Sequence, residues 1–482
     1  MQFPFTARYA SLPSHMYEGA LPTPVSDPSY LLVNHELALD LGLDADALAG
    51  AEGLAVLAGN TIPVTATPLS MAYAAHQFGH FVPQLGDGRA ILLGELRDQR
   101  GVLQDVQLKG AGPTPYSRRG DGRNWFGPVL REYVISEWMH TMGVPTTRAL
   151  AAVATGEHIQ RQRVLPGAIL TRVARSHIRV GTFEYFSSRQ DTDGLTALVD
   201  HVIAHHFPDA AAAEWPALAL LQAVAQRQAE LVAHWLSVGF IHGVMNTDNC
   251  SVTGDTIDYG PCAFMDDFRE HQVFSSIDHR GRYAYSNQAP VAQWNLSILA
   301  RSLLPLIGAD IKAGVALAQP VVDAFPDILE SARLALFRRK LGLVTHKEDD
   351  DALVNDLLTV MNDDEADFTR TFRGLSHSAS VARAEFAVPQ AFDAWAERWT
   401  SRVALDQDED SRRAAMQAVN PAYIPRNHRI EQMIEAAVLG NLTPLHTLVD
   451  VLSEPFVERT EYADYALGPA PNEVVHATFC GT

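Results

Sequence analysis

Residues 241–268 have the sequence IHGVMNTDNCSVTGDTIDYGPCAFMDDF, which gathers several polar side chains in a short segment between apolar residues. An Ala- and Leu-rich stretch with helical spacing precedes it at 211–238. The segment itself has the pattern of a loop, a strand-like hairpin and a second loop. Asn249 offers an amide oxygen and Asp258 a carboxylate, the hard ligands that Mg²⁺ takes together with phosphate oxygens and water. The segment therefore predicts a divalent-metal site.

A glycine turn and a lysine precede this segment in the chain. Gly86 and Gly88, followed by Arg89, lie in a strand–turn–strand pattern whose backbone N–H groups can cover phosphates. Lys109 ends the next predicted strand, and Glu132 lies on the predicted helix that follows. This order of glycine turn, strand lysine, helix glutamate and metal loop is that of a protein kinase.

Two points stay open in this comparison with kinases. Glu137 competes with Glu132 as the partner of Lys109, because both glutamates lie on the same predicted helix. A kinase catalytic loop carries its base two residues after a histidine, and the corresponding residue here is Val244, which accepts no proton. Either the protein is inactive, or Asp248 does the work of the base.

Arginine supplies 33 of the 37 basic residues, and arginines cluster beside these motifs. Guanidinium groups suit phosphate oxygens, so we expect the clusters either to hold an anion or to form ion pairs with acidic side chains. Arg172 and Arg179 are seven residues apart and would face opposite sides of a continuous strand, so both reach one ligand only if the chain bends near residues 176–177. The clusters are Arg118, Arg119 and Arg123, and Arg172, Arg175 and Arg179.

The composition disfavours several classes of protein. The 482 residues include 37 basic and 57 acidic side chains, and the net charge of −20 disfavours binding to nucleic acid or to an anionic membrane. Three cysteines and the lack of a basic, apolar leader favour a reducing compartment, so we expect a cytoplasmic protein. No apolar stretch of about 18 residues occurs, so we expect no membrane span.

The order of patterns along the chain predicts an α+β, protein-kinase-like bilobal fold with N- and C-terminal extensions. Residues 1–69 form the N-terminal extension in this prediction. Residues 70–190 form a β-rich, nucleotide-binding lobe, in which 168–186 also have a β-like pattern. Residues 191–482 form a helical lobe with the catalytic and metal loops and the C-terminal extension.

Long stretches of the chain resemble the selenoprotein O family, a set of pseudokinases that act as protein adenylyltransferases. The resemblance covers nearly the whole chain and is strongest from about residue 70 to 435. The stretches that carry it are QFGHFVPQLGDGRAILLGEL (77–96), LKGAGPTPYSRRGDGR (108–123), RVARSHIRVGTFEYF (172–186), HGVMNTDN (242–249), TIDYGPCAFMD (256–266), NQAPVAQWNLSILARSL (287–303) and NPAYIPRNHRIEQMIEAA (420–437).

The resemblance implies that ATP binds head-to-tail relative to ordinary kinases, so that AMP moves onto a Ser, Thr or Tyr hydroxyl of a protein, the enzyme itself included. It implies Asp248 as the proton acceptor and Asn249 and Asp258 as ligands of Mg²⁺, with Asp258 also a nucleotide contact. The further nucleotide contacts that it implies, with Glu132 as the partner of Lys109, are Gly86, Gly88, Arg89, Lys109, Asp121, Gly122, Arg172 and Arg179.

Three alternatives remain beside protein adenylylation. Some bacterial members of the family use UTP with Mn²⁺, which makes UMP transfer an alternative activity. A phosphotransferase of ordinary polarity is the second alternative, and a catalytically inactive, nucleotide-binding scaffold is the third, since the kinase base is missing.

The cysteines depart from part of the family. Some bacterial members bridge a C-terminal cysteine to one in the activation segment, but that segment, residues 268–285, has no cysteine here. Phe274 occupies the position in this segment where we would expect the cysteine that pairs with Cys480, so we do not expect this disulfide. Cys262 remains an alternative partner of Cys480.

Overall fold

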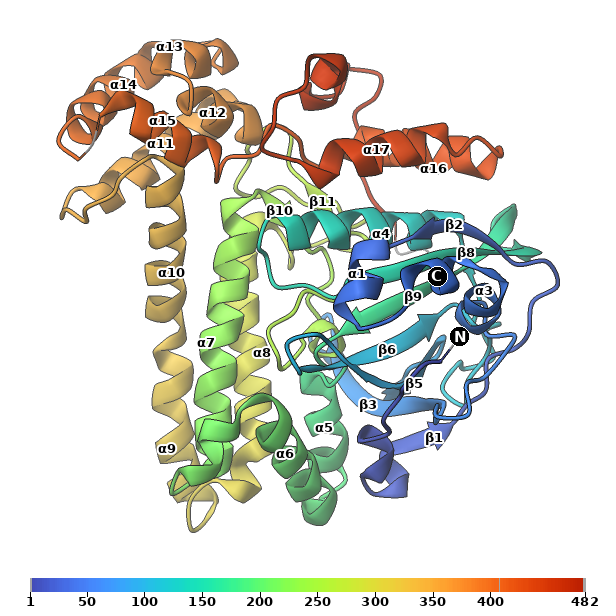
Figure 1. The fold of residues 1–482 in the computed structure, drawn as a ribbon. Coiled ribbons are helices and arrows are strands. Elements are labelled where there is room, and N and C mark those ends of the chain that lie inside the picture. Colours follow the sequence, from blue (N-terminus) through green and yellow to red (C-terminus); the bar gives the residue numbers. More distant parts are fainter. Residues whose placement is uncertain (1, 407, 480–482) are drawn as a thin grey trace.

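A nine-stranded antiparallel sheet forms one half of the computed structural model, which describes residues 2–406 and 408–479 (Figure 1). The strand order is β1-β3-β5-β6-β9-β8-β2, with β4 paired to β3 and β7 paired to β9. The strands are β1 (Tyr17–Gly19), β2 (Ser29–Val33), β3 (Leu69–Gln77), β4 (His80–Gly86), β5 (Ala90–Arg97), β6 (Leu103–Lys109), β7 (Asn124–Trp125), β8 (Arg148–Gln160) and β9 (Val164–Ala174).

Both faces of the sheet are apolar and both are covered, which explains the nearly continuous apolar runs of the central strands. In β5, Ile91 and Leu93 face one core while Leu92 faces the other, because successive side chains of a strand alternate. Three short helices cover the first face: α1 (His35–Asp40), α2 (Ala45–Ala49) and α3 (Ala51–Leu57). Helix α4 (Phe126–Thr141) covers the second face and joins it to the helical part.

The helical part begins with α5 (Val180–Ser188), α6 (Thr192–His206) and α7 (Pro216–Ser237). Helix α7 packs against α8 (Gln288–Leu303) and α10 (Phe325–Lys340), and Figure 1 shows these long helices side by side with α9 (Ile311–Asp323). Two-residue strands, β10 (Phe240–Ile241) and β11 (Ala263–Phe264), pair beside the end of α7. This small hairpin fixes both ends of the polar segment 242–262.

The last third of the chain is also helical. Helices α16 (Asn427–Val438) and α17 (Thr443–Ser453) return to pack on α4. The other helices form a separate group beyond the end of α10 (Figure 1): α11 (Asp350–Asp364), α12 (Phe368–Leu375), α13 (Ala379–Ala382), α14 (Gln390–Val403) and α15 (Glu409–Gln417). None of the helices in the described ranges is both long and apolar enough to cross a membrane.

The α+β class predicted from the sequence is confirmed, but two local predictions are wrong. The β-like pattern of 168–186 holds only to Ala174, because the chain bends and begins α5 at Val180. The predicted hairpin within 241–268 is not formed by its polar residues; its strands are the apolar ends of the segment, β10 and β11. The boundary at residue 69 stays a prediction, and β1 and β2, which precede it, pair with β3 and β8 of the main sheet.

Candidate active site

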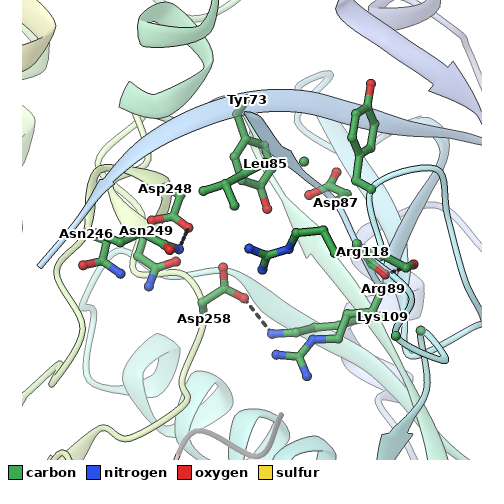
Figure 2. A pocket seen from close by; sticks show the side chains of 18 of the residues that line it. Tyr73, Leu85, Asp87, Arg89, Lys109, Arg118, Asn246, Asp248, Asn249 and Asp258 are labelled. Carbon is green, nitrogen blue, oxygen red and sulfur yellow. Dashed lines mark hydrogen bonds and ion pairs between the residues drawn. The ribbon is translucent and has the colours of Figure 1, made fainter. Parts of the chain in front are cut away.

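A pocket of about 660 Å³ opens between the sheet and the polar segment 242–262 (Figure 2). Its walls come from β3, the turn between β4 and β5, the end of β6, the loop 116–123 and the segment around η4 (Thr247–Asn249). All but one of the residues implied by the family resemblance line this pocket: Gly86, Gly88, Arg89, Lys109, Asp121, Gly122, Arg172, Arg179, Asp248, Asn249 and Asp258. The remaining one, Glu132, lies just behind it.

Four charged side chains join the sheet, helix α4 and the polar segment. Lys109 Nζ lies 2.6 Å from a carboxylate oxygen of Glu132 and 2.6 Å from Asp258 Oδ1. Arg172 contacts the same two carboxylates at 3.2 and 2.8 Å. Burial alone would raise the pKa of Asp258, but the charges of Lys109 and Arg172 outweigh it and hold that pKa well below its usual range. The carboxylate of Asp258 is therefore charged and central to the pocket.

The choice between Glu132 and Glu137 is decided by the direction in which each side chain leaves α4. Glu132 is buried and accepts from Lys109. Glu137 lies on the other side of the helix and forms a bidentate pair with Arg148 at 2.7 to 3.1 Å. The ion pair of Glu132 with Lys109, which the family resemblance implies, is present.

The bend between β9 and α5 brings Arg179 into the same pocket as Arg172. Arg179 is the residue before the first turn of α5, and its guanidinium lies 3.5 Å from Asp87 and 3.7 Å from Asp258. It also donates to the backbone carbonyl of Asp248 at 3.2 Å and stacks over the Tyr73 ring. One arginine thus contacts both the glycine turn and the polar segment.

Asp248 lies at the opposite end of the pocket from Arg89 and Arg118 (Figure 2). Its Oδ2 accepts a hydrogen bond from the Gln77 amide at 3.0 Å. Its Oδ1 is buried and has no hydrogen-bond partner in the described ranges. Burial raises the pKa of Asp248 to about 6, against the opposing effects of Gln77 and Arg179. A buried carboxylate oxygen without a partner suits a group that accepts a proton from a ligand.

The residues implied as metal ligands fit a magnesium ion that is shared with a nucleotide. The Asn249 amide nitrogen donates to the Val244 carbonyl at 2.9 Å, which leaves the amide oxygen of Asn249 for a cation. Asp258 adopts a left-handed backbone conformation, with φ of 63°. No group of three or more His, Cys, Asp or Glu that could hold an ion occurs among the described residues. Two protein ligands leave several positions for phosphate and water oxygens, which is how Mg²⁺ is usually held beside a nucleotide.

The glycines of the turn between β4 and β5 also have a structural reason. A Cβ on Gly86 would lie 2.3 Å from the Tyr116 ring, and one on Gly88 would lie 2.9 Å from the Tyr116 carbonyl oxygen. The turn therefore needs glycine because the loop 116–123 packs directly on it. Gly122 has φ of +65°, and a Cβ there would lie 2.0 Å from the Gly112 carbonyl oxygen.

Sequence patterns missed two residues of the pocket. Arg161, from the turn between β8 and β9, forms a bidentate pair with Asp121 at 2.7 and 2.9 Å. Asp121 is thus already paired with Arg161, and both residues line the pocket. Gln77, from the end of β3, holds Asp248. Neither residue belongs to a motif with a known spacing, and only the sheet pairing brings them to the pocket.

The C-terminal tail contacts the polar segment and the activation segment. Thr478 donates its backbone N–H to the Phe274 carbonyl at 2.7 Å, and its own carbonyl accepts from Ser276 at 2.9 Å. Its hydroxyl donates to the carbonyl of Pro261, three residues after Asp258. Cys480, on which the redox expectation rests, lies outside the described residues.

Comparisons with known proteins show the family of the chain. A family model described as protein adenylyltransferase SelO matches residues 1–453. The chain belongs to the SelO family. Relatives of the same family carry the name protein nucleotidyltransferase YdiU and match over their whole length. The relative from Bradyrhizobium diazoefficiens is 55% identical over 489 residues, covering 100% of both chains.

Other relatives are similarly close. One from Rhodopseudomonas palustris is 56% identical over 489 residues, covering 100% of both chains. One from Methylorubrum populi is 54% identical over 496 residues, covering 100% of this chain and 99% of the relative. The family predicted from the motifs is thus confirmed, and the chain is a nucleotidyltransferase.

Proposed function

We propose that this SelO-family chain transfers AMP from ATP to Ser, Thr or Tyr hydroxyls of proteins, its own included, with ATP inverted relative to ordinary kinases. The observation that carries the proposal is the order of groups along the pocket. Asp248 lies on one side of the pocket, Asp258 lies in the middle, and the turn and loop that carry Arg89 and Arg118 lie on the other side (Figure 2). The β- and γ-phosphates carry most of the negative charge and would bind beside Arg89 and Arg118. The α-phosphate would then lie beside Asp258 and closest to Asp248.

In this arrangement the acceptor hydroxyl oxygen attacks the α-phosphorus, and the bond from that phosphorus to the bridging oxygen of the β-phosphate breaks. Oδ1 of Asp248 accepts the hydroxyl proton, and Gln77 keeps the carboxylate in place. Lys109 and Arg172 stabilise negative charge that develops toward the pyrophosphate leaving group. Magnesium held by Asn249 and Asp258 would add positive charge beside the phosphate oxygens.

We also infer that the domains follow the protein-kinase plan. The β-rich residues 70–190 would form the nucleotide-binding lobe, and residues 191–482 the helical lobe with its extension. Residues 1–69 would be an extension that supports the β-rich lobe through β1 and β2. The Lys109–Glu132 pair between strand and helix supports this assignment, because kinases use the same pair to hold their phosphate-binding lysine.

Position-specific labelling tests the proposed function. The protein is incubated with magnesium and ATP labelled at either the α- or the γ-phosphate, and label on protein is measured after denaturation. We expect label from the α-position and none from the γ-position, and an Asp248→Asn variant should lose most of it. Label from the γ-position would indicate a phosphotransferase of ordinary polarity.

Two further outcomes separate the remaining alternatives. Tight ATP binding with no label at either position, over a broad protein extract, would indicate an inactive nucleotide-binding scaffold. The same experiment with α-labelled UTP and manganese tests UMP transfer. A Glu137→Gln variant serves as the control, because Glu137 pairs with Arg148 outside the pocket and the change also neutralises one carboxylate of α4.

A further inference from the structure

Seven cationic side chains line the pocket, and they differ in whether a carboxylate already neutralises them. Within the described residues, Arg118 has neither an ion pair nor a side-chain hydrogen bond, and Arg89 has only a hydrogen bond to the Asn124 amide oxygen at 3.1 Å. The other five have carboxylate partners within 4 Å: Lys109, Arg123, Arg161, Arg172 and Arg179.

The backbone at Arg118 is held in a conformation that arginine rarely adopts. Arg118 has φ of 48° and Arg119 has φ of 74°, so two consecutive residues with side chains are left-handed. Each left-handed residue with a side chain lowers the stability of the fold by about 1 kcal/mol or more, and such residues are concentrated at active sites and ligand-binding sites. The conformation directs Arg118 into the wall of the pocket, whereas Arg119 does not line it.

The loop that carries Arg118 is fastened to the glycine turn on its N-terminal side. The Ser117 hydroxyl donates to the Gly88 carbonyl, and the Thr114 hydroxyl donates to the Asp87 carbonyl at 2.7 Å. The Gly120 N–H closes the loop by donating to the Ser117 carbonyl at 2.7 Å. The backbone of Arg118 is therefore held in place, while its side chain is exposed and has no partner among the described residues.

We propose that Arg118 binds the terminal phosphates of the nucleotide and so recognises a triphosphate against a monophosphate. The proposal rests on the proposed function, because it assigns the end of the pocket farthest from Asp248 to the leaving group. An unpaired guanidinium has donors free for phosphate oxygens and loses no ion pair on binding them. A general attraction between positive charge and acidic protein acceptors would instead be shared by Arg119, which is also exposed on the same loop.

Calorimetric titration of magnesium–ATP and of AMP into Arg118→Gln and Arg119→Gln variants tests this assignment. We expect Arg118→Gln to weaken ATP binding about ten- to a hundredfold, the range for one charge-assisted contact, and to leave AMP binding within about twofold. Arg119→Gln should leave both within about twofold. Arg118→Lys, which keeps the charge and loses the planar fork, should recover part of the ATP affinity.

Three results would overturn the assignment: equal losses for ATP and AMP, no loss for either, or the same loss in both glutamine variants. A change confined to the KM of a protein acceptor would also overturn it and place Arg118 at the acceptor side. The titrations use ATP with a methylene bridge between its α- and β-phosphates, which blocks AMP transfer, so the outcome is independent of the labelling experiment. The two proposals can also fail separately. If Arg118→Gln loses its preference for ATP over AMP while the labelling experiment gives γ-label on protein, AMP transfer is refuted but the contact of Arg118 with the phosphates stands.

Discussion

Replacing Lys340 by methionine should stabilise the protein in a way that depends on pH. Lys340 ends α10 and is only 5% exposed, with its Nζ 4.5 Å from the Phe372 ring centre and 5.7 Å from that of Phe368. No carboxylate pairs with it in the described part of the chain. Burial lowers the pKa of this lysine from 10.5 to about 7. Methionine fills the same space without a charge.

The size of the effect follows from the difference between the two pKa values. Below pH 7 the lysine is charged in both the folded and the unfolded state, and burying the charge costs up to about 5 kcal/mol. Between pH 7 and 10.5 the folded state has lost the proton that the unfolded state keeps, so wild-type stability from this group rises by about 1.4 kcal/mol per pH unit. The advantage of Lys340→Met should therefore shrink by about 2 kcal/mol between pH 7 and pH 9, because the slope reaches its full value only above pH 7.

Urea unfolding followed by circular dichroism at pH 6, 7, 8 and 9 measures this difference between variant and wild type. Packing changes are independent of pH and shift all values equally, so the slope isolates the charge. Lys312→Met, at an exposed position of α9, is the matched control and should show no slope. A constant difference between Lys340→Met and wild type across this range would refute a lowered lysine pKa.

Three further predictions concern the pocket. Asp258→Ala should lower transfer about a hundredfold or more, since a central anion that is also the proposed metal ligand is lost; near wild-type rates in a label-transfer assay would remove Asp258 from the mechanism. Gln77→Leu should lower kcat about tenfold and leave the KM for ATP unchanged, because only Asp248 is released; a rise in KM alone would assign Gln77 to nucleotide binding. Glu132→Gln should destabilise the free protein by about 3 kcal/mol in urea unfolding, because the buried charge of Lys109 loses one of its two carboxylate partners. Binding of ATP should restore part of this stability, and unchanged stability of the variant would contradict this reasoning.

The sequence contained most of the groups of the candidate site because they belong to ordered motifs. Lys109 and Asp258 are 149 positions apart, yet their order along the chain and their local patterns predicted a common site. Local pattern failed where two residues of one helix were equivalent, as with Glu132 and Glu137. Their roles differ only because one faces Lys109 and the other faces Arg148.

Other parts of the fold could not be predicted from local patterns because they depend on contacts between residues distant in the chain. Residues 180–186 contain β-branched and aromatic side chains and yet lie in α5, because packing in the helical part outweighs intrinsic preference. Arg161 reaches Asp121 only through the long hairpin of β8 and β9, whose register is a tertiary property. The small strands β1 and β2 are likewise defined by partners far along the chain.

The contact of Thr478 with Pro261 and Phe274 has a consequence for biosynthesis. The polar loop beside the pocket gains its last backbone support from a residue more than two hundred positions further along the chain. A nascent chain still attached to the ribosome short of residue 478 would hold the strands that line the pocket and Asp258 but lack this support. The loop would thus reach its final arrangement only after residue 478 has emerged.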